Sequence, residues 1–160
     1  MPVAQTKTTR AALVLILLAM LAAPAWARNE RTPEEARARM EHHLKEVTRL
    51  AQHFEGVLNA DCPRFGSRQE WTAYFDGEVD QVVLLVAHLE QAWFEATRTG
   101  DDDVRRTAKA PRKRLDQARA LLDKLHGCAE DNGTSFSSMA VWRRIEREVP
   151  QRQSQIALPQ

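Results

Sequence analysis

The sequence predicts an all-α protein, an up-down helical bundle of three long helices plus a shorter fourth with one disulfide. Three observations support this fold class. Apolar residues recur every three or four positions over long segments, as on amphipathic helices. Capping motifs, glycines and prolines separate these segments. The two cysteines follow the first and third segments, and these segments end at the same end of an up-down bundle.

The first predicted helix covers about residues 33–58. Thr32 and Glu35 form a capping box, with Pro33 at the first helical position. Asn59 is a plausible left-handed stop. The apolar stripe of this helix consists of Ala36, Met40, Leu44, Val47, Ala51, Phe54 and Leu58.

The second predicted helix opens at a second capping box, Ser67 to Glu70, and ends near Arg98, before Gly100. Its stripe consists of Trp71, Phe75, Val82, Leu85, Val86, Leu89, Trp93 and Ala96. Further apolar residues widen this stripe around the helix. A helix that is apolar on so much of its circumference usually contacts more than one neighbour, so we expect it to be central.

The third predicted helix begins after Asp101 and ends at His126–Gly127, just before Cys128. Its apolar register continues across Pro111, which favours one helix kinked at the proline. The alternative is two helices, the second beginning at Pro111.

A shorter fourth helix is expected to start at a cap on Thr134 or Ser135 and to end before Pro150. Residues 151–160 are polar, and we expect them to be a disordered C-terminal tail.

Residues 1–27 have the pattern of a signal peptide. Lys7 and Arg10 precede the apolar segment 11–22, and Ala25 and Ala27 form an A-x-A cleavage pattern. The apolar segment has twelve residues, whereas a membrane-spanning helix needs about 20. We therefore expect cleavage, no membrane span in the mature chain, and an exported bundle domain of residues 28–150, either periplasmic or secreted. An uncleaved anchor is the alternative.

The charge balance of the mature chain is close to neutral. Of the 23 basic residues, removal of Lys7 and Arg10 leaves 21, against 22 acidic residues, for a net charge of −1. This balance, together with export, argues against nucleic acid as a partner.

The two cysteines of the chain, Cys62 and Cys128, are expected to form a disulfide in an oxidising compartment. Two free thiols are the alternative. Neither cysteine belongs to a C-x-x-C motif, which argues against thioredoxin-like chemistry and covalent haem attachment.

Glu78 interrupts the apolar arc of the second predicted helix. A buried carboxylate is costly unless it is paired, hydrogen-bonded or protonated. Arg119 on the third helix is its nearest plausible partner, which predicts a buried ion pair. A ligand- or metal-binding acid, or a helix rotated so that Glu78 is exposed, are the alternatives.

A segment without acidic residues, 104–115, carries the most distinctive surface charge of the chain. Its candidate face for an anionic partner consists of Arg105, Arg106, Lys109, Arg112 and Lys113. Such a face suits phosphate, an anionic lipid head group or an acidic protein. A solvated helix face is the alternative.

The histidines show no recognisable ligand spacing. His43 lies at the flank of the first stripe and His126 near the end of the third helix, whereas His42 and His53 are expected to face solvent. We therefore expect no metal site and no cofactor, and the absence of a catalytic motif argues against an enzyme.

The sequence thus predicts an exported, non-catalytic helical binding or interaction module. Its partner is an unknown protein or an anionic surface, and its oligomeric state is not predicted. The alternative is a bundle that carries a ligand, haem or a metal through Glu78 and His43.

Overall fold

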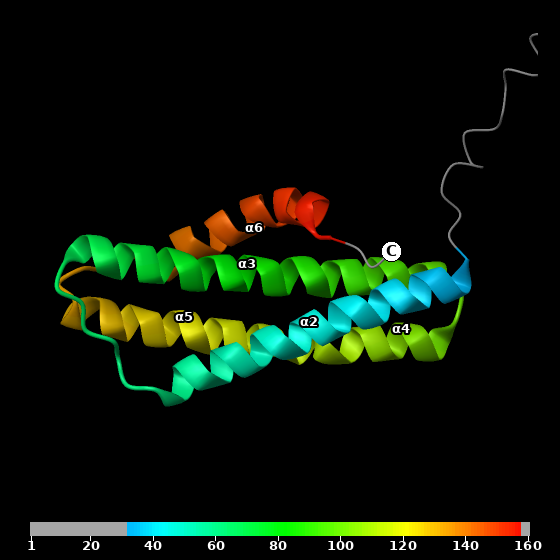
Figure 1. The fold of residues 1–160 in the computed structure, drawn as a ribbon, viewed down its shortest axis with the longest axis horizontal. Coiled ribbons are helices and arrows are strands. Elements are labelled where there is room, and N and C mark those ends of the chain that lie inside the picture. Colours follow the sequence, from blue (N-terminus) through cyan, green and yellow to red (C-terminus); the bar gives the residue numbers. More distant parts are fainter. Residues whose placement is uncertain (1–31, 158–160) are drawn as a thin grey trace, which may run out of the picture. The chain divides into compact units, whose positions relative to one another are not determined.

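The computed structural model describes residues 32–157, which form helices and no strand. The predicted signal peptide, residues 1–27, lies outside this range. The α-helices in Figure 1 are α2 (Pro33–Asn59), α3 (Arg68–Arg98), α4 (Asp102–Lys109), α5 (Arg114–Asp131) and α6 (Ser138–Gln155). A 3-10 turn, η2 (Ala110–Lys113), separates α4 from α5. The all-α fold with one disulfide is confirmed.

Helix α3 is the centre of the bundle, as predicted. It packs against α2, α4, α5 and α6, and α2 runs along it in the opposite direction (Figure 1). Its buried side chains point to several sides of the helix, since Val79, Val82, Val83 and Leu85 are all inaccessible to solvent. The wide apolar surface of α3 is therefore covered by different neighbours.

Both predicted capping boxes are present. At α2, the Thr32 hydroxyl accepts from the Glu35 backbone N–H, and the Glu35 carboxylate accepts from the Thr32 backbone N–H. Ser67 and Glu70 make the same reciprocal pair at α3. Each box satisfies N–H groups that the first helical turn leaves without an intrahelical acceptor.

Pro111 changes the type of helix without ending the helical path. The 3-10 turn η2 carries the chain from α4 into α5 at the proline, which has no N–H to donate to the preceding turn. The structure thus lies between the two predicted alternatives.

Helix α5 then continues to Asp131, so the predicted end at His126–Gly127 is wrong. The helix is stabilised beyond Gly127 because Cys128 and Ala129 are buried. The left-handed residue that follows the helix is Gly133, with φ of 64°.

Helix α6 starts and ends later than predicted. Its cap is Ser137 rather than Thr134 or Ser135, and it continues through Pro150 to Gln155. The prediction that residues 151–160 form a disordered tail is therefore wrong for 151–155. The Gln153 amide donates to Glu90 on α3, and this contact holds the last turn of α6 against the bundle.

The buried apolar residues form two clusters. The larger surrounds α3 and includes side chains from α2, α5 and α6. The smaller consists of Met40, Ala92, Ala96, Val104 and Ala108, where α4 meets α2 and α3.

Candidate functional site

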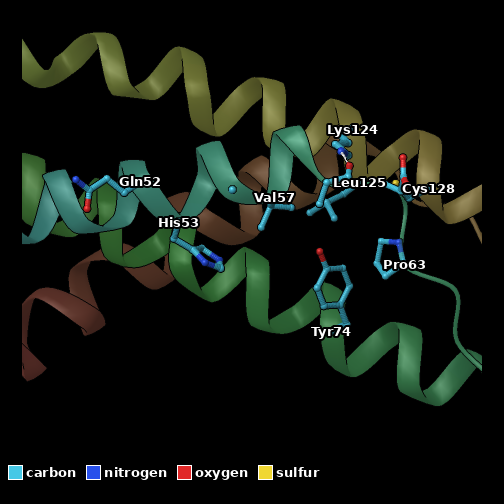
Figure 2. A pocket seen from close by; sticks show the side chains of 11 residues that line it. Gln52, His53, Val57, Pro63, Tyr74, Lys124, Leu125 and Cys128 are labelled. Carbon is cyan, nitrogen blue, oxygen red and sulfur yellow. Dashed lines mark hydrogen bonds between the residues drawn. The ribbon is translucent and has the colours of Figure 1, made fainter.

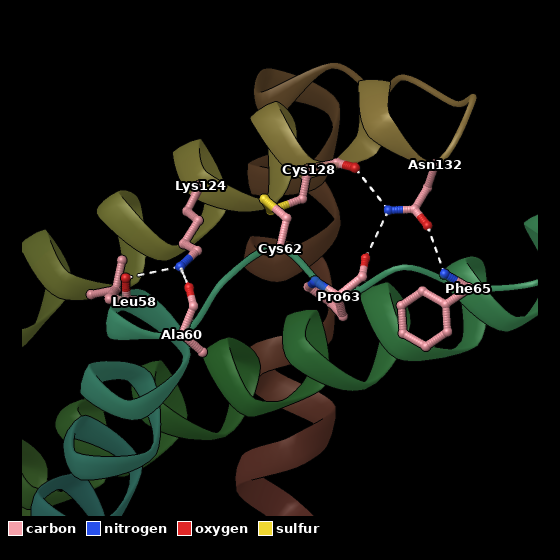
Figure 3. Close-up of a disulfide and its surroundings, with 8 residues drawn as sticks. All are labelled: Leu58, Ala60, Cys62, Pro63, Phe65, Lys124, Cys128 and Asn132. Atoms are coloured by element: carbon pink, nitrogen blue, oxygen red, sulfur yellow. Dashed lines mark hydrogen bonds between the residues drawn. A yellow bond between two sulfur atoms is a disulfide. The ribbon is translucent and has the colours of Figure 1, made fainter.

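The disulfide between Cys62 and Cys128 joins the loop after α2 to α5 (Figure 3). Their Cα atoms are 5.4 Å apart, and the predicted pairing is confirmed. Beside it, the Lys124 ammonium donates to the Leu58 carbonyl at 2.9 Å and also to the Ala60 carbonyl. A cation here satisfies carbonyls that the last turn of α2 leaves open.

Asn132 holds the rest of the loop in place. Its side-chain amide donates to the carbonyls of Pro63, at 3.0 Å, and Cys128, at 2.9 Å. Its amide oxygen accepts from the backbone N–H of Phe65 at 3.1 Å (Figure 3). The loop between α2 and α3 is therefore fixed to α5 by one covalent bond and by two polar side chains.

A pocket of about 360 Å³ lies beside this loop, with walls from α2, α3, α5 and the loop itself (Figure 2). The apolar wall consists of Gly56, Val57, Ala60, Pro63, Leu125 and Cys128. Polar groups come from Gln52, His53, Asp61, Tyr74 and Lys124. The pocket is therefore mostly apolar, with a few polar atoms at defined places.

Glu78 is buried, with 7% of its surface exposed, but its partner is His53 and not Arg119. Glu78 Oε2 and His53 Nε2 are 2.9 Å apart. Arg119 instead lies 3.4 Å from the exposed Asp116 on its own helix. The predicted Glu78–Arg119 pair is thus corrected, because α2 rather than α5 supplies the polar side chain next to Glu78.

Tyr74 lies one helical turn before Glu78, and its hydroxyl points into the pocket (Figure 2). Burial raises the pKa of this phenol, and the negative charge of Glu78 raises it further. The hydroxyl therefore stays protonated at neutral pH and can donate a hydrogen bond to a molecule in the pocket.

The predicted basic face is only partly available. Arg105 bonds to Asp102, and Arg106 lies 2.6 Å from Asp103, each pair within one turn of α4. The remaining members of the face, Lys109, Arg112 and Lys113, are exposed. The guanidinium of Arg112 also lies over the Trp93 ring, 5.3 Å from its centre.

A histidine cluster between α2 and α3 was not predicted. His43 is fully buried and His88 is 7% exposed, and their Nδ1 atoms are 3.0 Å apart. The ring of His42 lies next to both. His126, in contrast, is exposed and packs on Phe136. Periodicity could have found His88, since it falls one turn after Leu85 on the buried side of α3.

Between residues 32 and 157, no three His, Cys, Asp or Glu side chains are placed to hold a metal ion. Nor does any helix of this range have the length and apolar content that crossing a membrane requires.

The chain matches no protein-family model, and no curated protein or solved structure is significantly similar to it.

Proposed function

We propose that the chain is an exported, non-catalytic binding module that holds a small molecule in the pocket beside the disulfide. The observation that carries this proposal is the way the pocket is built. Its walls come from three helices and a loop, and the disulfide, Lys124 and Asn132 hold that loop in place. Preformed pockets of several hundred Å³, apolar with a few polar groups, are typical of small-molecule sites.

The charges around the pocket indicate a neutral ligand. The pocket lining contains one acid, Asp61, and one cation, Lys124, so their formal charges balance. The buried Glu78 carboxylate is not part of the lining and has His53 as its hydrogen-bond partner. A charged ligand would leave the mostly apolar pocket with an unbalanced charge, which is costly. The Tyr74 hydroxyl offers one donor. We therefore infer a molecule with an apolar body and one carbonyl or hydroxyl group.

Filling the pocket tests the proposal. A Cβ added at Gly56 meets no atom within 4 Å, so Gly56→Leu places a side chain in the pocket region without a backbone clash. Gly77 is equally open and is not among the lining residues, which makes Gly77→Leu the matched control. The probes are acetophenone, a neutral ketone, and benzoate, an anion of similar size.

We expect acetophenone to raise the melting temperature of the wild type and of Gly77→Leu, because a ligand that binds only the folded state stabilises it. Gly56→Leu should show no such rise, and benzoate should raise the melting temperature of the wild type and of Gly77→Leu less than acetophenone does. Equal shifts in Gly56→Leu and in the wild type would contradict binding in this pocket. A larger effect of benzoate would contradict the inferred neutral ligand.

The basic face remains a second candidate surface, for an anionic partner. The favouring observation is that Lys109, Arg112 and Lys113 are exposed within a segment that has no acidic residue from 104 to 115. We expect glutamate at these three positions to abolish sedimentation with vesicles that contain anionic lipid. The Gly77→Leu protein, whose charge is unchanged, serves as control. Equal sedimentation of the charge-reversed protein would exclude this face.

A further inference from the structure

The contact between His43 and His88 depends on the number of protons it carries. With 3.0 Å between the two Nδ1 atoms, one nitrogen must donate and the other must accept. A neutral imidazole has one N–H and one lone pair, whereas an imidazolium has two N–H groups and no acceptor. The hydrogen bond therefore forms when at least one ring is neutral, and it is lost when both rings are protonated.

Burial makes the doubly protonated state unfavourable. His43 is inaccessible to solvent and His88 is nearly so, and two adjacent cations in such a place repel each other and lack hydration. Burial lowers the pKa of His88, Glu46 raises it, and His42 and Arg49 lower it. Glu46 is only a partial counterion, since its carboxylate also accepts a hydrogen bond from Arg49 at 2.9 Å.

The pair lies where the two apolar clusters meet. One turn away from it, Met40 on α2 and Ala92 on α3 belong to the smaller cluster. One turn away on the other side, Val47 on α2 and Leu85 on α3 belong to the larger cluster. A break at the histidines would therefore separate α2 from α3 at the junction of the two clusters.

We propose that His43 and His88 form an acid-sensitive latch, which holds α2 against α3 at neutral pH and releases this contact when both rings are protonated. The latch does not depend on the pocket or on a ligand. Its functional consequence would be a bundle that loosens locally in an acidic compartment while the disulfide still joins the α2–α3 loop to α5.

Asparagine at both positions tests the latch, because two asparagines can share a hydrogen bond but do not titrate. The single variant His88→Asn is the second choice if the double variant does not fold. His126→Asn removes an exposed histidine on α5 and is the control. The measurement is amide hydrogen exchange at pH 7.5 and 5.5, corrected for the intrinsic exchange rate, with α6 as internal reference.

In the wild type and in His126→Asn, we expect acidification to reduce protection in α2 and α3 around the pair more than in α6. The double variant should show equal protection at both pH values. On unfolding, each of the two histidines becomes exposed and gains about one proton between pH 7.5 and pH 5.5. Over these two pH units the unfolding constant of the wild type should therefore rise about 10- to 100-fold more than that of the double variant.

Two results would overturn the proposal. The first is a pH-dependent loss of protection that is the same in the double variant, or that is equally large in α6. The second is a saturable rise in melting temperature with Zn²⁺ at pH 7.5 that the double variant lacks, since this would identify the pair as metal ligands.

Discussion

Replacing Cys62 and Cys128 together with alanine measures what the disulfide contributes to stability. The cysteines are 66 residues apart in sequence. A cross-link of this span lowers the entropy of the unfolded chain enough to stabilise the fold by about 4 kcal/mol. For a domain of this size, 1 kcal/mol shifts the melting temperature by about 4 °C, which gives a fall of about 15 °C.

The assay is urea denaturation of the double alanine variant, with the wild type in oxidised and reduced form for comparison. Because Lys124 and Asn132 still fix the loop, the folded state should change little, and most of the loss should come from a more expanded unfolded state. The dependence of unfolding free energy on urea should therefore become steeper. A loss below about 1 kcal/mol with an unchanged urea dependence would refute this reasoning.

Three further predictions concern single side chains. Lys124→Met removes a charged donor from the end of α2 and should cost about 1–2 kcal/mol in urea denaturation. Asp101 caps α4 through two backbone N–H groups, which hold its pKa below the usual range. Its contribution is present at neutral pH and is lost as pH falls through the lowered pKa, so Asp101→Asn should flatten the loss of stability below about pH 4. Gly127→Ala fits within α5 without contacts and should add about 0.5–1 kcal/mol of stability.

Local sequence patterns located most of the helices correctly, because the signals that start a helix lie within a few residues of its first turn. The two capping boxes needed only Thr32 with Glu35 and Ser67 with Glu70. The disulfide followed from two cysteines in a chain expected to be exported, and helix order supported the pairing. None of these predictions required knowledge of which faces of the helices meet.

The helix ends were predicted less well, because tertiary contacts decided them. A glycine within a helix costs about 1 kcal/mol, and burial of the next two residues after Gly127 outweighs this cost. At Pro150 the helix loses one backbone hydrogen bond, yet buried Val149 and the Gln153 contact with Glu90 keep the last turn of α6 on α3.

The partner of Glu78 was predicted incorrectly, because the sequence pattern does not show which neighbouring helix faces this carboxylate. In an antiparallel arrangement of the second and third predicted helices, Arg119 is the basic residue that lies roughly level with Glu78 along the bundle axis. This level does not specify which side of α3 the carboxylate occupies. At about 100° per residue, His53 lies only about 80° around α2 from the buried His43, at the edge of the interface rather than on the opposite face. From this edge its ring reaches Glu78 while its side chain stays 40% exposed. A partner that keeps its contact with water is a physical reason why α3 tolerates a buried carboxylate, since only one of the two groups is desolvated.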